Sequence, residues 1–83
     1  MNIFGNKIMS IPEIKNLLTQ NIGKKVCITE SNKQGKVIKE FIGEIVNTYT
    51  SIFVIKIKVN AKFLNKSFSY VDFLTNELSI EIL

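Results

Sequence analysis

The chain has 83 residues, a formal net charge of +4 at pH 7, and a composition that is 46% hydrophobic and 22% charged. This length allows one domain with a small core, which buries only about 60 to 65% of the surface of the unfolded chain. The composition excludes a disordered tail, and a single cysteine with no histidine excludes a disulfide framework and the usual zinc or catalytic histidine sites within one chain.

The first predicted element is a helix over residues 11–22. Ser10 and Glu13 match a capping box, in which the side chain of each residue accepts a hydrogen bond from the backbone amide of the other. Gly23 is placed to end the helix, because glycine readily takes the positive φ that is common after a last helical turn. One face of this helix carries an apolar stripe of Ile11, Ile14, Leu17, Leu18 and Ile22.

After Gly23 the apolar pattern changes from the helical period to period two, which indicates strands. Gly43 lies inside the second strand and indicates a bend or bulge, which a small barrel needs in a long strand. Residues 60–66 show no clear alternation, and we expect a looser segment there. The predicted strands cover residues 24–31, 36–47 and 53–59, with turns at 32–35 and 49–51.

The C-terminal stretch SFSYVDFLTNELSIEIL has two alternating segments with an interruption around Asp72. We expect Asp72 to accept hydrogen bonds from nearby amides and to start one helical turn, in which Phe73 and Leu74 plug one end of a barrel. A last strand follows over residues 77–82. The predicted fold class is therefore mainly β: a small SH3-like five-stranded barrel with an N-terminal α-helix and a short 3₁₀ turn before the last strand.

The domain organisation follows from these elements. Residues 1–9 are predicted to be a flexible N-terminal segment, and residues 10–83 a single SH3-like barrel domain with its N-terminal helix. The N-terminal segment has no apolar run of signal-peptide length, and no stretch of about 18 apolar residues occurs in the chain. We therefore expect a cytoplasmic protein that does not associate with membranes.

The sequence offers little for catalysis. Its four glycines are scattered and do not form a phosphate-binding loop, while Glu40 and Glu44 lie on one strand among apolar residues and do not resemble a paired carboxylate site. Cys27 is best interpreted as an inert, partly buried small residue. We predict no catalytic, cofactor-binding or metal-binding residues, and no enzymatic activity.

Lysines gather on the first two predicted strands and on the turn between them. They can form one basic edge that binds phosphates or an acidic partner, or they can belong to an ordinary solvated hairpin. Tyr49 and Tyr70 are candidates for an aromatic platform that holds bases or a proline-rich peptide, with core packing left open for both. The lysines of this candidate site are Lys24, Lys25, Lys33, Lys36 and Lys39.

A second apolar surface is predicted on the strand faces opposite the core. Together with the helix stripe it exceeds what one small barrel can bury, so either the helix or another chain covers it. We expect the helix to cover part of this surface and a second copy of the chain to cover the rest, which makes the protein a homo-oligomer. The candidate oligomer interface consists of Ile42, Val46, Ile52 and Val54.

Three segments resemble the Veg family of small proteins of low-GC Gram-positive bacteria, in the same order and at nearly the same spacing. They are NIGKK at 21–25, Gly43 together with YTSIFVI at 49–55, and SYVDFLT at 69–75. The third segment is the most distinctive. The likeness covers about residues 11–82, which is nearly the whole chain.

This resemblance implies a non-enzymatic regulator that stimulates biofilm formation by binding a protein partner, such as a transcriptional repressor of matrix genes. Family members often carry glycines and arginines at 31–36 and a proline where Thr50 stands, and lysine lacks the bidentate phosphate geometry of arginine. The alternative function is an SH3-like nucleic-acid-binding module that uses the basic hairpin between Lys24 and Lys39. Binding to phosphates falls steeply with salt, whereas binding through an apolar protein interface changes little.

Overall fold

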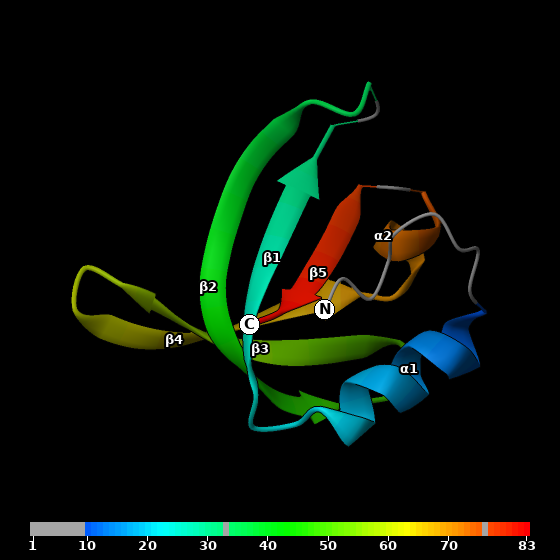
Figure 1. The fold of residues 1–83 in the computed structure, drawn as a ribbon, viewed down its shortest axis with the longest axis horizontal. Helices are drawn as coiled ribbons and strands as arrows, with labels where there is room; N and C mark the ends of the chain where they lie inside the picture. Colours follow the sequence, from blue (N-terminus) through cyan, green and yellow to red (C-terminus); the bar gives the residue numbers. More distant parts are fainter. Residues whose placement is uncertain (1–9, 33, 76) are drawn as a thin grey trace.

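A five-stranded antiparallel sheet makes up most of the structure, with one helix packed against it (Figure 1). The computed structural model describes residues 10–32, 34–75 and 77–83, so the predicted flexible segment at 1–9 lies outside the described residues. The elements in chain order are α1 (Ile11–Gln20), β1 (Lys25–Ser31), β2 (Val37–Thr48), β3 (Ile52–Val59), β4 (Lys62–Ser69), α2 (Val71–Leu74) and β5 (Leu78–Ile82).

The strand order is β4-β3-β2-β1-β5, which places β4 and β5 at opposite edges of the sheet. The prediction of a mainly β fold with five strands and an N-terminal helix is confirmed. The prediction of a closed barrel is wrong, because the described parts of β4 and β5 do not pair with each other. Instead, β4 turns into α2 at one end, and the other end of the β3–β4 hairpin projects away from the sheet (Figure 1).

The predicted capping box begins α1. The Glu13 amide donates to the Ser10 hydroxyl at 3.4 Å, and the Ser10 amide donates to the Glu13 carboxylate at 3.1 Å. The Ser10 hydroxyl also donates to the Glu13 carboxylate at 2.9 Å. The two hydrogen bonds that Ser10 donates to this carboxylate hold the pKa of Glu13 below its usual range, the backbone amide contributing more than the hydroxyl. The helix ends at Gln20, two residues earlier than predicted, and Gly23 has a φ of +90° in the turn that follows.

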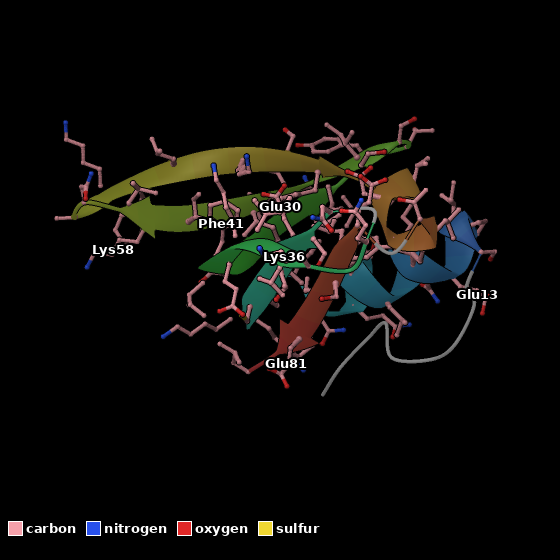
Figure 2. All side chains as sticks on the ribbon, turned by 90° about the horizontal axis from the view of Figure 1, so that it is seen from above. Glu13, Glu30, Lys36, Phe41, Lys58 and Glu81 are labelled. Carbon is pink, nitrogen blue, oxygen red and sulfur yellow. The ribbon has the colours of Figure 1, made fainter. Side chains whose placement is uncertain are left out.

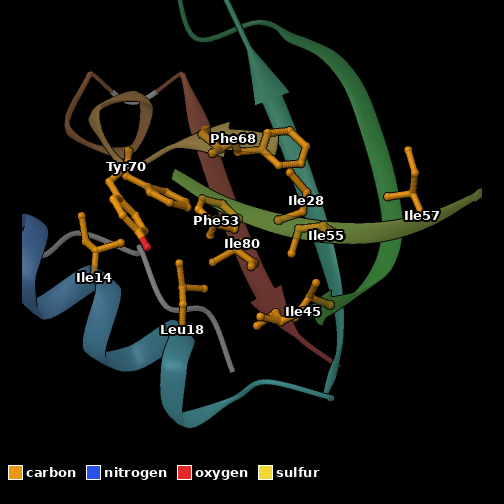
Figure 3. Close-up of a cluster of buried hydrophobic side chains, with 13 residues drawn as sticks. Ile14, Leu18, Ile28, Ile45, Phe53, Ile55, Ile57, Phe68, Tyr70 and Ile80 are labelled. Carbon is orange, nitrogen blue, oxygen red and sulfur yellow. The ribbon is translucent and has the colours of Figure 1, made fainter. Parts of the chain in front are cut away.

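Two residues of the apolar stripe of α1 enter the core. Ile14 and Leu18 are completely buried and point toward Phe53 and Tyr70 (Figure 3). We call the sheet face that carries the core the inner face, and its opposite the outer face. Because α1 packs on the inner face, it leaves the outer face uncovered.

An aromatic stack holds the core at the α2 end of the sheet. The Phe53 ring stacks on the rings of Phe68, Tyr70 and Phe73 at centroid distances of 5.6, 5.7 and 5.5 Å. The Tyr70 hydroxyl donates to the Tyr49 carbonyl oxygen at 2.7 Å, which satisfies a polar group on a completely buried residue. Burial, which disfavours the charged phenolate, raises the pKa of Tyr70.

Close contact between β2 and β3 explains why glycine occupies position 43. A Cβ atom there would lie 2.5 Å from the Lys56 carbonyl oxygen and 2.6 Å from the Ile55 Cγ2 atom, so no other residue fits without a shift. The register of β2 against β3 shifts between Ile45 and Asn47. The long strand β2 curves through the sheet, as the glycine had indicated (Figure 1).

The predicted looser segment at 60–66 is wrong, since Lys62–Ser69 forms the eight-residue strand β4. It pairs with β3 from Val59 opposite Lys62 onward, and only Asn60 and Ala61 lie between the strands. Both turn residues have positive φ, +50° and +66°, which is the pattern of a type I′ hairpin turn. Glycine is the usual second residue of such a turn. Because alanine stands there in this chain, the sequence lacked the usual hairpin signal.

The helical turn before β5 is present, but it differs in detail from the prediction. It is one α-helical turn, not a 3₁₀ turn, and it begins at Val71, whose amide donates to the Ser69 hydroxyl at 3.3 Å. Its N-cap residue is Tyr70 and has no side-chain capping bond, so Asp72 does not start the turn. Phe73 is buried as predicted, whereas Leu74 is 46% exposed and plugs nothing.

Candidate functional site

The structure does not bring the predicted lysines together in one basic edge. Lys24 and Lys25 lie at the start of β1, whereas Lys36 precedes β2 and Lys39 pairs with Glu30 near the far end of the same ladder. Lys25 and Lys39 are therefore separated along the ladder by five residues, about 17 Å at 3.4 Å per residue. Lys33, the fifth candidate, lies outside the described residues.

Acidic residues also face these lysines across the β1–β2 ladder. Lys25 lies directly opposite Glu44, and Lys39 lies directly opposite Glu30. Glu40 is close by, opposite Thr29 on the same pair of strands. Charges of both signs thus alternate over this hairpin, which weakens its attraction for phosphates compared with a surface of lysines alone.

The two candidate tyrosines have different environments. Tyr49 lies in the turn between β2 and β3 and is 50% exposed. Tyr70 is completely buried in the aromatic stack around Phe53. Of the two rings, only that of Tyr49 is available to a binding partner in this structure.

Three of the four predicted interface residues lie together on the outer face. Ile52 and Val54 are two residues apart on β3, so they share one face. Val46 lies in the register shift of β2, between buried Ile45, which pairs with Ile55, and exposed Asn47, which pairs with Val54. We call Val46, Ile52 and Val54 the apolar patch; Val46 and Ile52 are each 38% exposed and Val54 is half-buried.

The fourth predicted interface residue stands apart from the apolar patch. Ile42 is 49% exposed on the outer face of β2, opposite Cys27 of β1. It precedes Val46 by four residues, about 13 Å along the strand, and Glu44 projects from the same face between them. One contact surface can include Ile42 and the patch only if it also accommodates the Glu44 carboxylate.

The most uniform charge lies on the β3–β4 hairpin, which was not among the predicted sites. The two strands and their turn contain four lysines and no acidic residue. In fact no aspartate or glutamate occurs between Glu44 and Asp72, and this was the sequence signal available. The lysines are Lys56 and Lys58 on β3, with Lys62 and Lys66 on β4.

An exposed aromatic ring accompanies the lysines of β3. Phe63 is 65% exposed and lies directly opposite Lys58 in the hairpin ladder. The Lys56 and Lys58 ammonium groups lie over its ring, at 5.4 and 5.9 Å from the centroid, within the range of cation–π attraction. Figure 2 shows Lys58 near the projecting end of the hairpin, on the side of the molecule opposite Glu13 and α1.

A hollow of about 890 Å³ lies beside this ring. Lys56, Lys58 and Phe63 of the hairpin line one side, and Glu40, Ile42, Glu44 and Lys25 contribute from β2 and β1. Across the strands, Lys25 pairs with Glu44 and Glu44 pairs with Lys56, so these three side chains form one row on the outer face. The hollow is therefore apolar in part, basic on the hairpin side and mixed in charge on the β2 side.

Neither a metal site nor a membrane span emerges from the described residues. Nowhere in 10–32, 34–75 and 77–83 do three histidine, cysteine, aspartate or glutamate side chains come together in a way that could hold a metal ion. Over the same ranges, no helix combines the length and the apolar character needed to cross a bilayer.

A family model described as biofilm formation stimulator VEG matches residues 9–81. The chain belongs to the Veg family. The resemblance predicted from the sequence is thereby confirmed, and the match includes α1, α2 and nearly all of the sheet. Among curated proteins, none matches the chain closely enough to count as a relative. The description of the Veg family is regulatory and names no reaction.

The most distinctive Veg segment of this chain, at 69–75, serves the fold. Tyr70 and Phe73 within it are buried against Phe53, and Ser69 accepts the first hydrogen bond of α2. This segment therefore does not by itself mark a binding surface, whereas the segment at 49–55 contains Ile52 and Val54 of the apolar patch. Exposed residues that the sequence or the structure groups into surfaces include the apolar patch and the lysines of the β3–β4 hairpin.

Proposed function

We propose that this protein is a non-enzymatic regulator that stimulates biofilm formation by binding another protein, namely a transcriptional repressor of matrix genes. The observation that carries the proposal is the Veg family match over residues 9–81. A cytoplasmic location follows from the proposal, since a repressor of transcription acts there. The order of the strands and the helical turn before β5 also support an SH3-like origin for the open sheet.

The apolar patch is the surface we propose for the partner. Ile52 and Val46 are each 38% exposed on the outer face, and α1 packs on the opposite face. Small polar residues on β4, Ser67 opposite Val54 and Ser69 opposite Ile52, border the patch. An apolar centre with a polar border is the usual anatomy of a protein interface.

Charge and apolar contact have separate roles in this mechanism. The excess of lysine, a net charge of +4, hastens encounter with an acidic partner surface. Burial of the apolar patch then supplies most of the affinity, and a repressor held in this way is kept off its operator. Binding by the patch should therefore change little with salt, while the rate of association should fall as salt rises.

The inherited function is tested by deleting the gene in its host. Surface-attached growth and matrix-gene transcripts are expected to fall in the deletion strain, and the wild-type gene supplied in trans should restore both. Surface growth and transcripts that stay unchanged after deletion would refute the proposed function, whatever the protein binds.

We also propose that the chain associates with itself through the apolar patch when no partner is present. A chain of 83 residues has a small core and gains stability from covering such a surface. Sedimentation equilibrium at high micromolar concentration should show a homo-oligomer that Val54→Asp converts to monomers. Wild-type protein that sediments only as a monomer would contradict self-association.

A further inference from the structure

The outer face of the β3–β4 hairpin combines an aromatic ring with lysines. Phe63 is 65% exposed, and the Lys56 and Lys58 ammonium groups lie 5.4 and 5.9 Å from the centre of its ring. We call these three residues the lysine–phenylalanine face. We propose that this face binds single-stranded nucleic acid, with a base stacked on Phe63 and the adjoining phosphates held by the two lysines.

The charge of the hairpin favours a polyanionic ligand. The hairpin and its flanks from 45 to 71 carry four lysines and no carboxylate. Lys56 and Lys58 lie on the outer face and the other two lysines on the inner face, so the hairpin as a whole attracts polyanions and the outer face contributes two of the charges. On the predicted basic hairpin, Lys25 and Lys39 each face a glutamate, Glu44 and Glu30. On the β3–β4 hairpin, Glu44 also lies opposite Lys56, but the cross-strand neighbour of Lys58 on β4 is Phe63 and not a carboxylate. Phosphate binding is therefore expected on β3 and β4, and not on the strands where the sequence had placed it.

The exposed Phe63 ring favours a single strand over a duplex. Aromatic side chains on an open sheet stack with successive bases, and nearby basic groups follow the backbone of the strand. Phe63 lies on such an open face: its side chain is exposed, and β4 is an edge strand with no neighbour beyond it among the described strands. A duplex presents no free base faces to this ring, so single strands should bind better than duplexes.

The hollow beside Phe63 determines which way the bases and the phosphates of the bound strand face. Its 890 Å³ is within the size range of ligand pockets, and Glu40 and Glu44 line the side away from the hairpin. These carboxylates repel phosphates and accept hydrogen bonds from base amino groups. The phosphates are thus expected along Lys56 and Lys58, with the bases turned toward the hollow.

The geometry of the hairpin does not favour insertion into a membrane. Phe63 and Leu64 are consecutive in β4, so their side chains point to opposite faces of the sheet. The turn at the end of the hairpin consists of Asn60 and Ala61, between Val59 and Lys62, so no large apolar side chain stands in the turn itself. Anionic vesicles are nevertheless a necessary comparison, because lysines attract them as well.

The test measures fluorescence anisotropy of labelled oligothymidylate and oligouridylate of about 12 nucleotides, a length within the range that single-strand-binding sheets cover. Purified full-length protein should bind both, with a log–log salt slope of about −0.7 per phosphate contact. Changing Lys56 and Lys58 to glutamine should make this slope shallower by about 1.4. Phe63→Leu, which keeps the ring's apolar bulk but removes stacking, should weaken binding about tenfold.

The matched control changes Lys36 and Lys39 to glutamine, which removes the same charge from the β1–β2 hairpin. This control should bind nearly as well as the wild type. Equal losses of affinity in the two double variants would show that binding depends only on net charge, and this would overturn the proposal. Duplexes of the same length that bind as tightly as the single strands would overturn it too, and so would binding to phosphatidylserine vesicles without binding to either oligonucleotide.

A variant that binds more tightly gives a result that misfolding would not produce. Glu44 lies directly opposite Lys56 and lines the hollow, so its carboxylate opposes phosphate binding. Glu44→Gln is expected to tighten binding several-fold at low salt, and the difference should shrink as salt rises. Unchanged or weaker binding by this folded variant would count against the proposed site.

Discussion

Replacing Gly43 by alanine tests the packing that shapes both candidate surfaces. The new methyl group would lie 2.5 Å from the Lys56 carbonyl oxygen, 2.6 Å from Ile55 Cγ2 and 3.0 Å from Ile57 Cγ2. The carbonyl belongs to the backbone of β3, so a change of side-chain rotamer cannot relieve that contact. To reach an ordinary separation of 3.4 Å, β2 and β3 must move apart by about 0.9 Å.

The expected cost follows from two opposing effects. Overpacking of this kind costs about 1 to 3 kcal/mol. Alanine is otherwise favoured over glycine inside a strand by roughly 0.5 to 1 kcal/mol, since it restricts the unfolded chain. We therefore expect Gly43→Ala to lower the free energy of unfolding by about 1 to 2 kcal/mol, out of a total of roughly 4 to 12 kcal/mol for a domain of this size.

The assay is urea unfolding followed by far-ultraviolet circular dichroism. With a slope of about 1 kcal/mol per molar urea, the midpoint should fall by roughly 1 to 2 M without a change in slope. Gly35→Ala serves as the control, because Gly35 has a φ of +83° and open space around it, so only backbone strain applies. If Gly43→Ala were neutral or stabilising, the close approach of β2 to β3 would be refuted.

Three further substitutions probe the turn, the core and the cap. Ala61→Gly should raise the free energy of unfolding by up to about 1 kcal/mol, since Asn60 and Ala61 both have positive φ; a loss of stability in urea would contradict the type I′ turn. Tyr70→Phe should cost about 1 kcal/mol, because the buried Tyr49 carbonyl bond is lost. Because the pKa of Tyr70 is raised in the folded state, the free energy of unfolding of the wild type should fall as pH rises from 10.0 through the folded pKa. The Tyr70→Phe variant should lose less stability over that range. Parallel losses in unfolding titrations of the two proteins would contradict this. Ser10→Ala should lower stability by about 1 kcal/mol, and an unchanged melting curve would show that the capping box contributes nothing.

Local signals in the sequence were sufficient for α1 and for most of the sheet. Ser10 and Glu13 act through neighbouring backbone amides, so their capping box was visible without knowledge of the fold. The buried run from Phe53 to Ile57 alternates because one face of β3 packs on the core. Where a strand is half-buried, its period of two is readable from the sequence.

The strand β4 was not predicted because half of it is not buried on either face. Its first half projects beyond the core and is exposed on both faces, so residues 62–65 show no alternation of apolar and polar side chains. Whether the sheet closes depends on pairing between β4 and β5, which are close in the chain, with α2 between them, but lie at opposite edges of the sheet. No local pattern reports such a contact.

The candidate site required the strand register. Lysines near in sequence, such as Lys25 and Lys39, lie at opposite ends of the β1–β2 ladder. Lys58 and Phe63, by contrast, become direct neighbours only because a two-residue turn pairs them. The absence of acidic residues from 45 to 71 was readable in the sequence, but the exposed ring among the lysines became visible only with the hairpin.

The central claim is that this Veg-family regulator acts through its apolar patch, and matrix-gene transcripts in the host test it most directly. The deletion strain receives the wild-type gene, a patch variant with Ile52→Asp and Val54→Asp, or a control with Asn16→Asp and Gln20→Asp, which adds the same charge on exposed positions of α1. A milder patch variant with threonine at both positions guards against misfolding, since threonine favours strands. We expect the wild-type and control genes to restore the transcripts, and folded patch variants present at equal levels to fail. Full restoration by the aspartate patch variant would contradict the account.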